Sequence, residues 1–202
     1  MEHEILLTGI GGQGVQLAGS ILAHAATREG REVMSLGTYG GTMRGGSTDA
    51  QIVIADEPIL SPPIVSEAGN ALAMHPAFFG PAAARLRPGA VVLCNSTVFD
   101  STPDRPDLRF ADLPATRLAT EQGNPMAASL VLLGGFCALR EIVSLENLIA
   151  AMEEAVPSYR RQHIEGNAAA LRLGYETLPR GKFPAWPAHA TAAMPAEAEA
   201  NP

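Results

Sequence analysis

The segment G-I-G-G-Q-G, residues 9–14, decides the fold, because it follows an apolar run and precedes an amphipathic one. The apolar run over residues 4–8 predicts a short strand. From Val15 onward, apolar residues recur at intervals of three and four, which predicts one face of a helix. A strand, a turn of the pattern G-x-G-x-x-G and a helix are typical of the first unit of a Rossmann-like α/β fold.

The rest of the chain alternates between strand and helix patterns. Further strands are predicted over residues 32–36, 50–55, 71–75 and 90–95. Helices are predicted over residues 76–86, 126–142, 145–156 and 159–176. Pro88 and Gly89 are the stop signal after the first of these helices, and Ser144 and Ser158 are the predicted N-caps of the last two. This order predicts an α/β fold, a Rossmann-like mostly parallel sheet with helices on both faces, a helical C-terminal part and an extended Ala/Pro-rich tail. We expect one domain over residues 1–177 and a flexible or partner-wrapping tail over residues 178–202.

Charge and cysteine content exclude several functions. The formal net charge of −7 argues against nucleic-acid binding, and Lys182 is the only lysine. Cys94 and Cys137 lie far apart in apolar runs, which predicts two buried thiols rather than a zinc or iron–sulfur site. The longest apolar stretch, residues 126–139, is too short to span a membrane, and the N-terminus lacks the pattern of a signal peptide. We therefore expect a cytoplasmic protein that binds neither membrane nor metal.

An NAD(P) site needs more than the glycine turn. A dinucleotide-binding enzyme has an acidic residue at the end of the second strand, where this chain reads S-L-G-T-Y-G. Three roles therefore stay open for the glycine loop: a tight turn, a contact with an anionic group of another ligand, or a contact with a neighbouring subunit.

A second glycine-rich loop, Y-G-G-T-M-R-G-G-S-T over residues 39–48, follows the second predicted strand. Two such loops after parallel strands should open at the same carboxyl edge of the sheet, where α/β proteins bind ligands. Arg44 in this loop has three readings: it grips a carboxylate or phosphate bidentately, it forms a salt bridge between subunits, or it is a solvated surface residue.

Several of these motifs together resemble one family. They are the segment G-I-G-G-Q-G-V, the loop Y-G-G-T-M-R-G-G-S-T, the turn D-E-P-I-L-S-P-P-I over residues 56–64, the run G-N-P-M-A-A-S-L-V-L-L-G-G over residues 123–135, and N-A-A-A-L-R-L-G over residues 167–174. The chain resembles the gamma subunit of the 2-oxoacid:ferredoxin (or other acceptor) oxidoreductases.

The resemblance implies a heteromeric enzyme that uses thiamine diphosphate to convert a 2-oxoacid and coenzyme A into acyl-CoA and carbon dioxide. It implies alpha and beta subunits as partners, which hold thiamine diphosphate, Mg and iron–sulfur clusters, and ferredoxin or another acceptor as the electron carrier. This chain would bind no cofactor alone, contribute no catalytic residue and be inactive in isolation. The loop pattern resembles the 2-oxoglutarate type, although Gly41-Thr42 stands where that type commonly has Pro-Glu, which leaves an aryl 2-oxoacid open.

The candidate residues are those expected to face the shared active site or a partner subunit. They are Gly9, Gly11, Gly12, Gln13, Gly14, Tyr39, Gly40, Arg44, Gly45, Gly46 and Asn124. Two other functions remain as alternatives: a stand-alone NAD(P)-binding oxidoreductase and a non-catalytic acyl-CoA-binding module. The apolar run over residues 126–139 is either a subunit contact or the domain's own central helix, and Phe183 and Trp186 either anchor on a partner or belong to a disordered extension.

Overall fold

A six-stranded sheet with the strand order β2-β3-β1-β4-β5-β6 forms the centre of the molecule. The structure is a computed structural model that describes residues 1–39, 45–60, 64–101 and 103–186. In chain order its elements are β1 (Glu2–Ile10), α1 (Val15–Arg28), β2 (Glu32–Tyr39), β3 (Ser47–Ala55), β4 (Ala68–Ala73), η1 (Pro76–Phe78), α2 (Phe79–Ala83), β5 (Leu86–Asn95), β6 (Arg109–Leu113), α3 (Ala115–Glu121), η2 (Pro125–Ala127), α4 (Ala128–Arg140), α5 (Leu145–Ala155), η3 (Ser158–His163) and α6 (Ile164–Thr177).

Five strands of the sheet run in one direction. β1 pairs in parallel with β4, and the parallel ladder continues through β5 to β6. β3 is antiparallel both to β1 and to β2, so that β2 points the same way as β1. The expected mostly parallel α/β sheet is therefore confirmed, and the carboxyl ends of five strands share one edge, where β3 begins.

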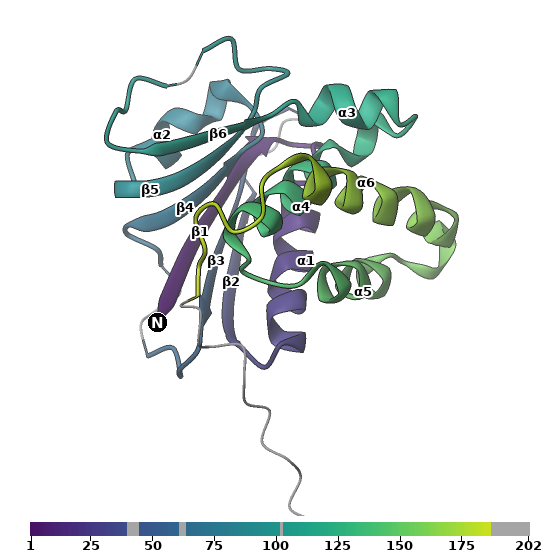
Figure 1. Cartoon of the computed structure of the whole chain (residues 1–202), viewed down its shortest axis with the longest axis horizontal. Coiled ribbons are helices and arrows are strands. Elements are labelled where there is room, and N and C mark those ends of the chain that lie inside the picture. Colours follow the sequence, from purple (N-terminus) through teal and green to yellow (C-terminus); the bar gives the residue numbers. More distant parts are fainter. Residues whose placement is uncertain (40–44, 61–63, 102, 187–202) are drawn as a thin grey trace, which may run out of the picture.

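The two faces of the sheet carry separate cores. Helices α1, α4, α5 and α6 lie on one face (Figure 1), where Ile5, Ile52 and Phe136 belong to a single buried cluster. On the other face Leu6 and Phe79 belong to a second, smaller cluster beneath α2. Neighbouring residues of β1 enter different clusters because side chains alternate across a strand. The expectation of helices on both faces is confirmed.

Helix α4 is the central helix of the domain. All of its residues are buried within this chain, so the apolar run from Ala127 to Leu139 is the domain's own core element, while Met126 at its start is exposed. Helix α6 crosses it closely, because Gly134 faces the Leu171 carbonyl and Gly174 faces the Val131 carbonyl. Glycine is required at both positions, since a β-carbon on either one would overlap the backbone of the other helix.

Strand β5 begins earlier than the sequence predicts, and Pro88 and Gly89 lie inside it. Between the pairs Ala68–Leu86 and Asn70–Val91 the strand takes up extra residues, which is a bulge. Gly89 has a φ of 80°, and its N–H donates to the Asp107 carbonyl at 2.8 Å. The predicted helix does end before this pair, since α2 stops at Ala83. The strand was predicted to start too late, because a proline and glycine pair can also mark an irregularity within a strand.

Two short elements were not predicted, and one of the two predicted helix caps is wrong. The short edge strand β6 and helix α3 have no counterpart among the predicted elements. Ser144 caps α5 as predicted, accepting a hydrogen bond from the Asn147 N–H at 3.3 Å. Ser158 does not act as a cap, because it is the first residue of η3, whose N-cap is Pro157.

The first part of the predicted tail packs on the domain; we call residues 178–186 the C-terminal strap. The N–H groups of Gly181, Phe183 and Ala185 donate to the carbonyls of residues 138, 139 and 140 at 2.8, 3.0 and 2.6 Å. These are carbonyls that the end of α4 leaves without helical partners. The expectation of a tail outside the fold was therefore wrong for residues 178–186, while residues 187–202 lie outside the described residues. No helix of the described part is long and apolar enough to cross a membrane.

Candidate functional site

The two glycine-rich loops meet at the carboxyl edge of the sheet, as the sequence predicts. Ile10, at the end of β1, pairs with Ser47, and Tyr39, at the end of β2, pairs with Thr48. The N–H of Gly11 donates to the carbonyl of Gly46 at 2.9 Å, which joins the loops directly.

The backbone of residues 9–14 requires glycine at several positions. Gly12 and Gly14 have φ angles of 99° and 78°, in the region that only glycine adopts readily. A β-carbon on Gly9 would lie 2.9 Å from a side-chain atom of Val15. Gln13 closes the turn, because its Oε1 accepts from the Ile10 N–H at 2.8 Å and its own N–H donates to the Ile10 carbonyl at 3.0 Å. Gln13 therefore shapes the loop rather than projecting from it.

Helix α1 begins at this loop without a side-chain cap. Its N-cap is Gly14, which offers no oxygen to the N–H groups of the first turn. These N–H groups and the positive end of the helix dipole favour a negatively charged oxygen beyond the loop. The arrangement can hold a carboxylate or a phosphate.

The start of helix α4 forms another side of the site. A β-carbon on Gly14 would lie 2.6 Å from the Ser129 hydroxyl oxygen, so the two residues are neighbours. Asn124 lies five residues earlier, where its carbonyl accepts from the Ala127 N–H at 2.9 Å. Its side-chain nitrogen lies beside Gly166 of α6. The backbone of Asn124 thus begins η2, and its amide faces α6.

Some candidate residues of the second loop cannot be placed. Gly40 and Arg44 lie outside the described residues, and Tyr39 is placed only as the last residue of β2. Gly45 is exposed with a φ of 86°, and Gly46 supplies the carbonyl that binds Gly11. The role of Arg44 stays a prediction.

Two polar residues that sequence reasoning did not single out lie at the junction of the loops. Thr48 is only 4% exposed, and its hydroxyl has no hydrogen-bond partner among the described residues. It lies next to Gly11, where a β-carbon would be 3.4 Å from the hydroxyl oxygen. Gln16 ties α1 to β3 by donating to the Asp49 carbonyl at 2.6 Å. Thr48 stood in the quoted loop, whereas Gln16 carried no recognisable signal.

The strand order argues against an NAD(P) site. In a dinucleotide-binding unit the strand after the first helix lies next to the first strand, so that its end reaches the ribose. Here the antiparallel β3 lies between β1 and β2, and its first residues lie beside the glycine loop. The glycine fingerprint therefore does not occur in the setting that dinucleotide binding requires.

The described residues offer no site for a metal or cluster. They contain no group of three or more His, Cys, Asp or Glu side chains that could hold a metal ion. Burial raises the pKa of Cys94 to about 12 and raises that of Cys137 as well, so both thiols stay protonated. Iron–sulfur chemistry does not fit this part of the chain.

A small cavity of about 80 Å³ lies on the α2 face of the sheet. Its lining includes Ser47, Asp49 and Phe78. Cofactor-sized sites are several times larger, on the order of 300 Å³ or more. The cavity is separate from the first turn of α1, and it does not account for the glycine loops.

Comparisons with known proteins agree on one family. Residues 4–177 match the family described as pyruvate ferredoxin/flavodoxin oxidoreductase. The 2-oxoglutarate synthase subunit KorC of Methanocaldococcus jannaschii is 34% identical over 180 residues, which cover 87% of this chain and 94% of that protein. The ketoisovalerate oxidoreductase subunit VorA of Methanothermobacter marburgensis is 33% identical over 138 residues, which cover 68% of this chain and 28% of VorA.

The solved structures give the same result. The gamma subunit of a keto/oxoacid ferredoxin oxidoreductase from Geobacter sulfurreducens superposes with a TM-score of 0.76 and 28% sequence identity. The superposition covers 87% of this chain and 95% of that subunit.

Proposed function

Because the chain belongs to the pyruvate ferredoxin/flavodoxin oxidoreductase family, we propose that it is the gamma subunit of a heteromeric, thiamine-diphosphate-dependent 2-oxoacid:ferredoxin (or other acceptor) oxidoreductase. The enzyme would convert a 2-oxoacid and coenzyme A into acyl-CoA and carbon dioxide. The observation that carries the proposal is the similarity to KorC along almost its whole length, at 34% identity.

The proposed substrate is 2-oxoglutarate. The support is the similarity to KorC, which is a 2-oxoglutarate synthase subunit, and the loop pattern noted above. An aryl 2-oxoacid is the competing substrate, because the pair Gly41-Thr42 departs from the 2-oxoglutarate-type pattern.

The chain's own contribution would be to hold an anionic group at the carboxyl edge. The first turn of α1 lacks a side-chain cap, and the buried Thr48 hydroxyl has no partner among the described residues. Both features fit the diphosphate of coenzyme A or the carboxylate of the 2-oxoacid. Thiamine diphosphate, when bound by the partner chains, supplies the electron sink that allows carbon dioxide to leave. The glycine loops would position the anionic substrate and exclude water from it.

Other chains would hold the remaining cofactors. The two buried cysteines and the absence of a metal-binding group among the described residues agree with iron–sulfur clusters and Mg in other subunits. In VorA the region that matches this chain makes up 28% of a longer protein. This supports the proposal that a separate chain of this size works together with a larger partner subunit. Leu17 and Met126, both exposed, flank the loop edge and are suited to a partner surface.

Purification of the chain from its own cells, with mass analysis of what stays bound, tests the proposal. We expect larger subunits that carry thiamine diphosphate and iron, and acceptor reduction that depends on coenzyme A. The preparation should be assayed with 2-oxoglutarate, pyruvate, indolepyruvate and phenylglyoxylate. A preference for an aryl 2-oxoacid would contradict the proposal that 2-oxoglutarate is the substrate, but it would agree with the proposed enzyme class. A single 21 kDa species that binds NAD would contradict the proposal altogether.

A further inference from the structure

Three cationic side chains come together at the edge of the sheet opposite the glycine loops. They are Arg109 of β6, Arg140 at the end of α4 and Lys182 of the C-terminal strap, and we call them the cationic patch. The aromatic ring of Phe183 joins them, with the Arg109 guanidinium 5.7 Å and the Lys182 ammonium 5.3 Å from its centroid. The Arg140 guanidinium donates to the carbonyls of Phe183 and Pro184.

Within the described residues, no ion pair balances the charge of this patch. The nearby Arg87 of β5 is paired with Glu4 at 2.6 Å, on the other face of the sheet. Among the described residues, no carboxylate oxygen lies within 4.0 Å of the nitrogens of Arg109, Arg140 or Lys182. The chain has a formal net charge of −7, so the clustering does not follow from an excess of basic residues.

Of the cations in the patch, Arg140 is the one whose charge is most costly to keep in the folded protein, because it is buried. It is only 9% exposed, and its Nε has no hydrogen-bond partner among the described residues. Burial and the nearby charges of Arg109 and Arg87 lower the pKa of Arg140 to about 10. A buried cation with two cationic neighbours is destabilising unless a negative group completes the arrangement.

The shape of this region suits a protein surface better than a small anion. On this face the amino-terminal halves of β4, β5 and β6 carry no helix, and the strap runs beside them, in front of β1 (Figure 1). Arg109 and Lys182 are exposed there, at the start of the edge strand β6 and on the strap. The cavity described above lies on the other face. Small-molecule sites are concave, whereas a spread of cations over strands and strap matches an extended acidic surface.

We propose that the cationic patch docks an acidic segment of a partner subunit, whose carboxylates pair with the exposed Arg109 and Lys182 and offset the charge of the buried Arg140 beside them. The inference rests on the proposed function only in requiring a heteromeric enzyme. The glycine edge and the cationic patch would then be two separate contacts with partner chains, at opposite ends of the sheet.

A zero-length carbodiimide cross-link tests the contact directly, because it joins an amine to a carboxylate that touches it. Lys182 is the only lysine, so the N-terminal amine is the only other amine of the chain that can react. In the purified complex, we expect peptide mass analysis to find Lys182 joined to an Asp or Glu of a larger subunit. Lys182→Arg keeps the charge and removes the amine, and should assemble normally without this cross-link. Cross-links of Lys182 only to its own chain would overturn the proposal.

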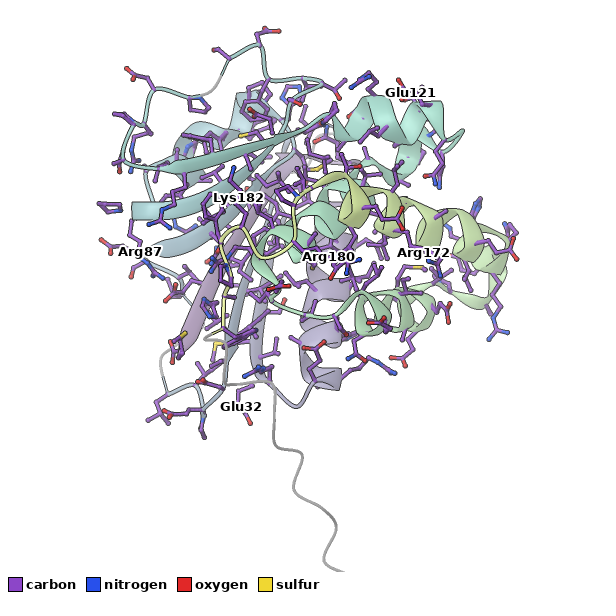
Figure 2. All side chains as sticks on the ribbon, viewed as in Figure 1. Glu32, Arg87, Glu121, Arg172, Arg180 and Lys182 are labelled. Carbon is purple, nitrogen blue, oxygen red and sulfur yellow. The ribbon has the colours of Figure 1, made fainter. Side chains whose placement is uncertain are left out.

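Affinity measurements give a second, independent readout. The double variant R109Q/K182Q should bind the purified partner subunits at least tenfold more weakly at 50 mM salt, with a smaller salt dependence. The matched control R160Q/R172Q removes the same charge from exposed arginines of η3 and α6; Figure 2 shows Arg172 on α6, away from Lys182. Its affinity should stay within twofold of wild type.

The outcomes separate this inference from the proposed function. If both double variants lose affinity equally, or if neither loses any, the inference is overturned. The proposed enzyme class still stands in that case, provided that the wild-type chain assembles with a thiamine-diphosphate enzyme. A wild-type chain that assembles with no thiamine-diphosphate enzyme would contradict the proposed function and this inference together.

Discussion

Gly12 and Gly30 share one backbone requirement but occupy different surroundings. Their φ angles are 99° and 71°, and a β-carbon on either one would meet no atom within 4 Å. Gly12 belongs to the loop that precedes α1, whereas Gly30 lies beyond the other end of that helix. Substituting each glycine in turn therefore distinguishes the backbone strain, which both variants share, from an effect on the candidate site, which only the Gly12 variant should have.

We expect Gly12→Ala and Gly30→Ala to lower the free energy of unfolding by similar amounts, about 1–2 kcal/mol each, because both force a β-carbon into the left-handed region. Only Gly12→Ala should also raise the KM of the assembled enzyme for its anionic substrates, by at least fivefold. Urea unfolding and steady-state kinetics on both variants check this. Equal KM values would show that the loop has no role in binding.

His3 gives the protein a pH-dependent stability. Its side chain is 7% exposed, and its ring meets Trp186 edge-on with the centroids 4.5 Å apart. Burial, helped by the positive charge of Arg140, lowers the pKa of His3 from 6.5 to about 4. The unfolded chain therefore binds a proton below pH 6.5 that the folded chain does not bind until about pH 4.

The stability from His3 is present above pH 6.5 and is lost as the pH falls toward 4. We expect the free energy of unfolding to drop by about 2 kcal/mol more in wild type than in His3→Gln between pH 7.5 and pH 5. Urea unfolding at both pH values measures the difference. Parallel curves for the two proteins would mean that the pKa of His3 is the same in the folded and the unfolded chain.

Single residues differ in how well the sequence predicts them. The glycines of residues 9–14 could be assigned to a turn, because only glycine tolerates such backbone angles. The contact between Gly14 and Ser129 could not be predicted, because 115 positions separate them and only the packing of α4 beside α1 brings them together. The sequence likewise contained no sign that Arg140 would be buried with no carboxylate partner among the described residues.

At the scale of elements, periodicity predicted every long helix and most strands. The failures are short elements and irregular ones. β6 has only five residues at the sheet's edge, too few for an alternation to be recognised. The first residues of β5 were not predicted as strand, because they contain Pro88 and Gly89, which usually interrupt a strand.

The crossing of α4 and α6 should be the element contact most sensitive to substitution. We expect Gly174→Ala to lower the free energy of unfolding by at least about 3 kcal/mol, because the β-carbon would overlap the Val131 carbonyl and force the helices apart. Urea denaturation at pH 7.5 measures the effect.

Gly166→Ala is the matched control in the same helix. There a β-carbon would lie 3.3 Å from the flexible Asn124 amide, which can move aside. Its effect should stay below about 1 kcal/mol, because alanine also favours the helix. A comparable loss in both variants would contradict the importance of the crossing.

For the whole molecule, the sequence predicted the fold class but not the strand order. Local patterns place strands along the chain, whereas the insertion of β3 between β1 and β2 depends on pairing between distant segments. The strap was missed for a related reason. Residues 178–186 show no periodicity, and their order comes from the α4 carbonyls to which they bind.

Truncation should reveal the contribution of the strap. A chain that ends at Thr177 loses three backbone hydrogen bonds to the end of α4, those from the Arg140 guanidinium to the Phe183 and Pro184 carbonyls, and the one from the Trp186 indole to the Ile142 carbonyl. We expect it to unfold with a free energy at least about 3 kcal/mol lower than a chain that ends at Trp186. Chemical denaturation of the two truncated chains makes the comparison. Equal stability would mean that the strap adds nothing to the fold.

The contact between His3 and Trp186 also brings the beginning and the end of the described domain together, at the edge opposite the glycine loops. A short peptide could join these two ends, so that the chain could be reopened elsewhere as a circular permutant with the glycine edge undisturbed. The same arrangement makes the domain modular. A longer polypeptide can enter and leave it on one side, which is how one fold can serve both as a separate subunit and as a segment of a protein the size of VorA.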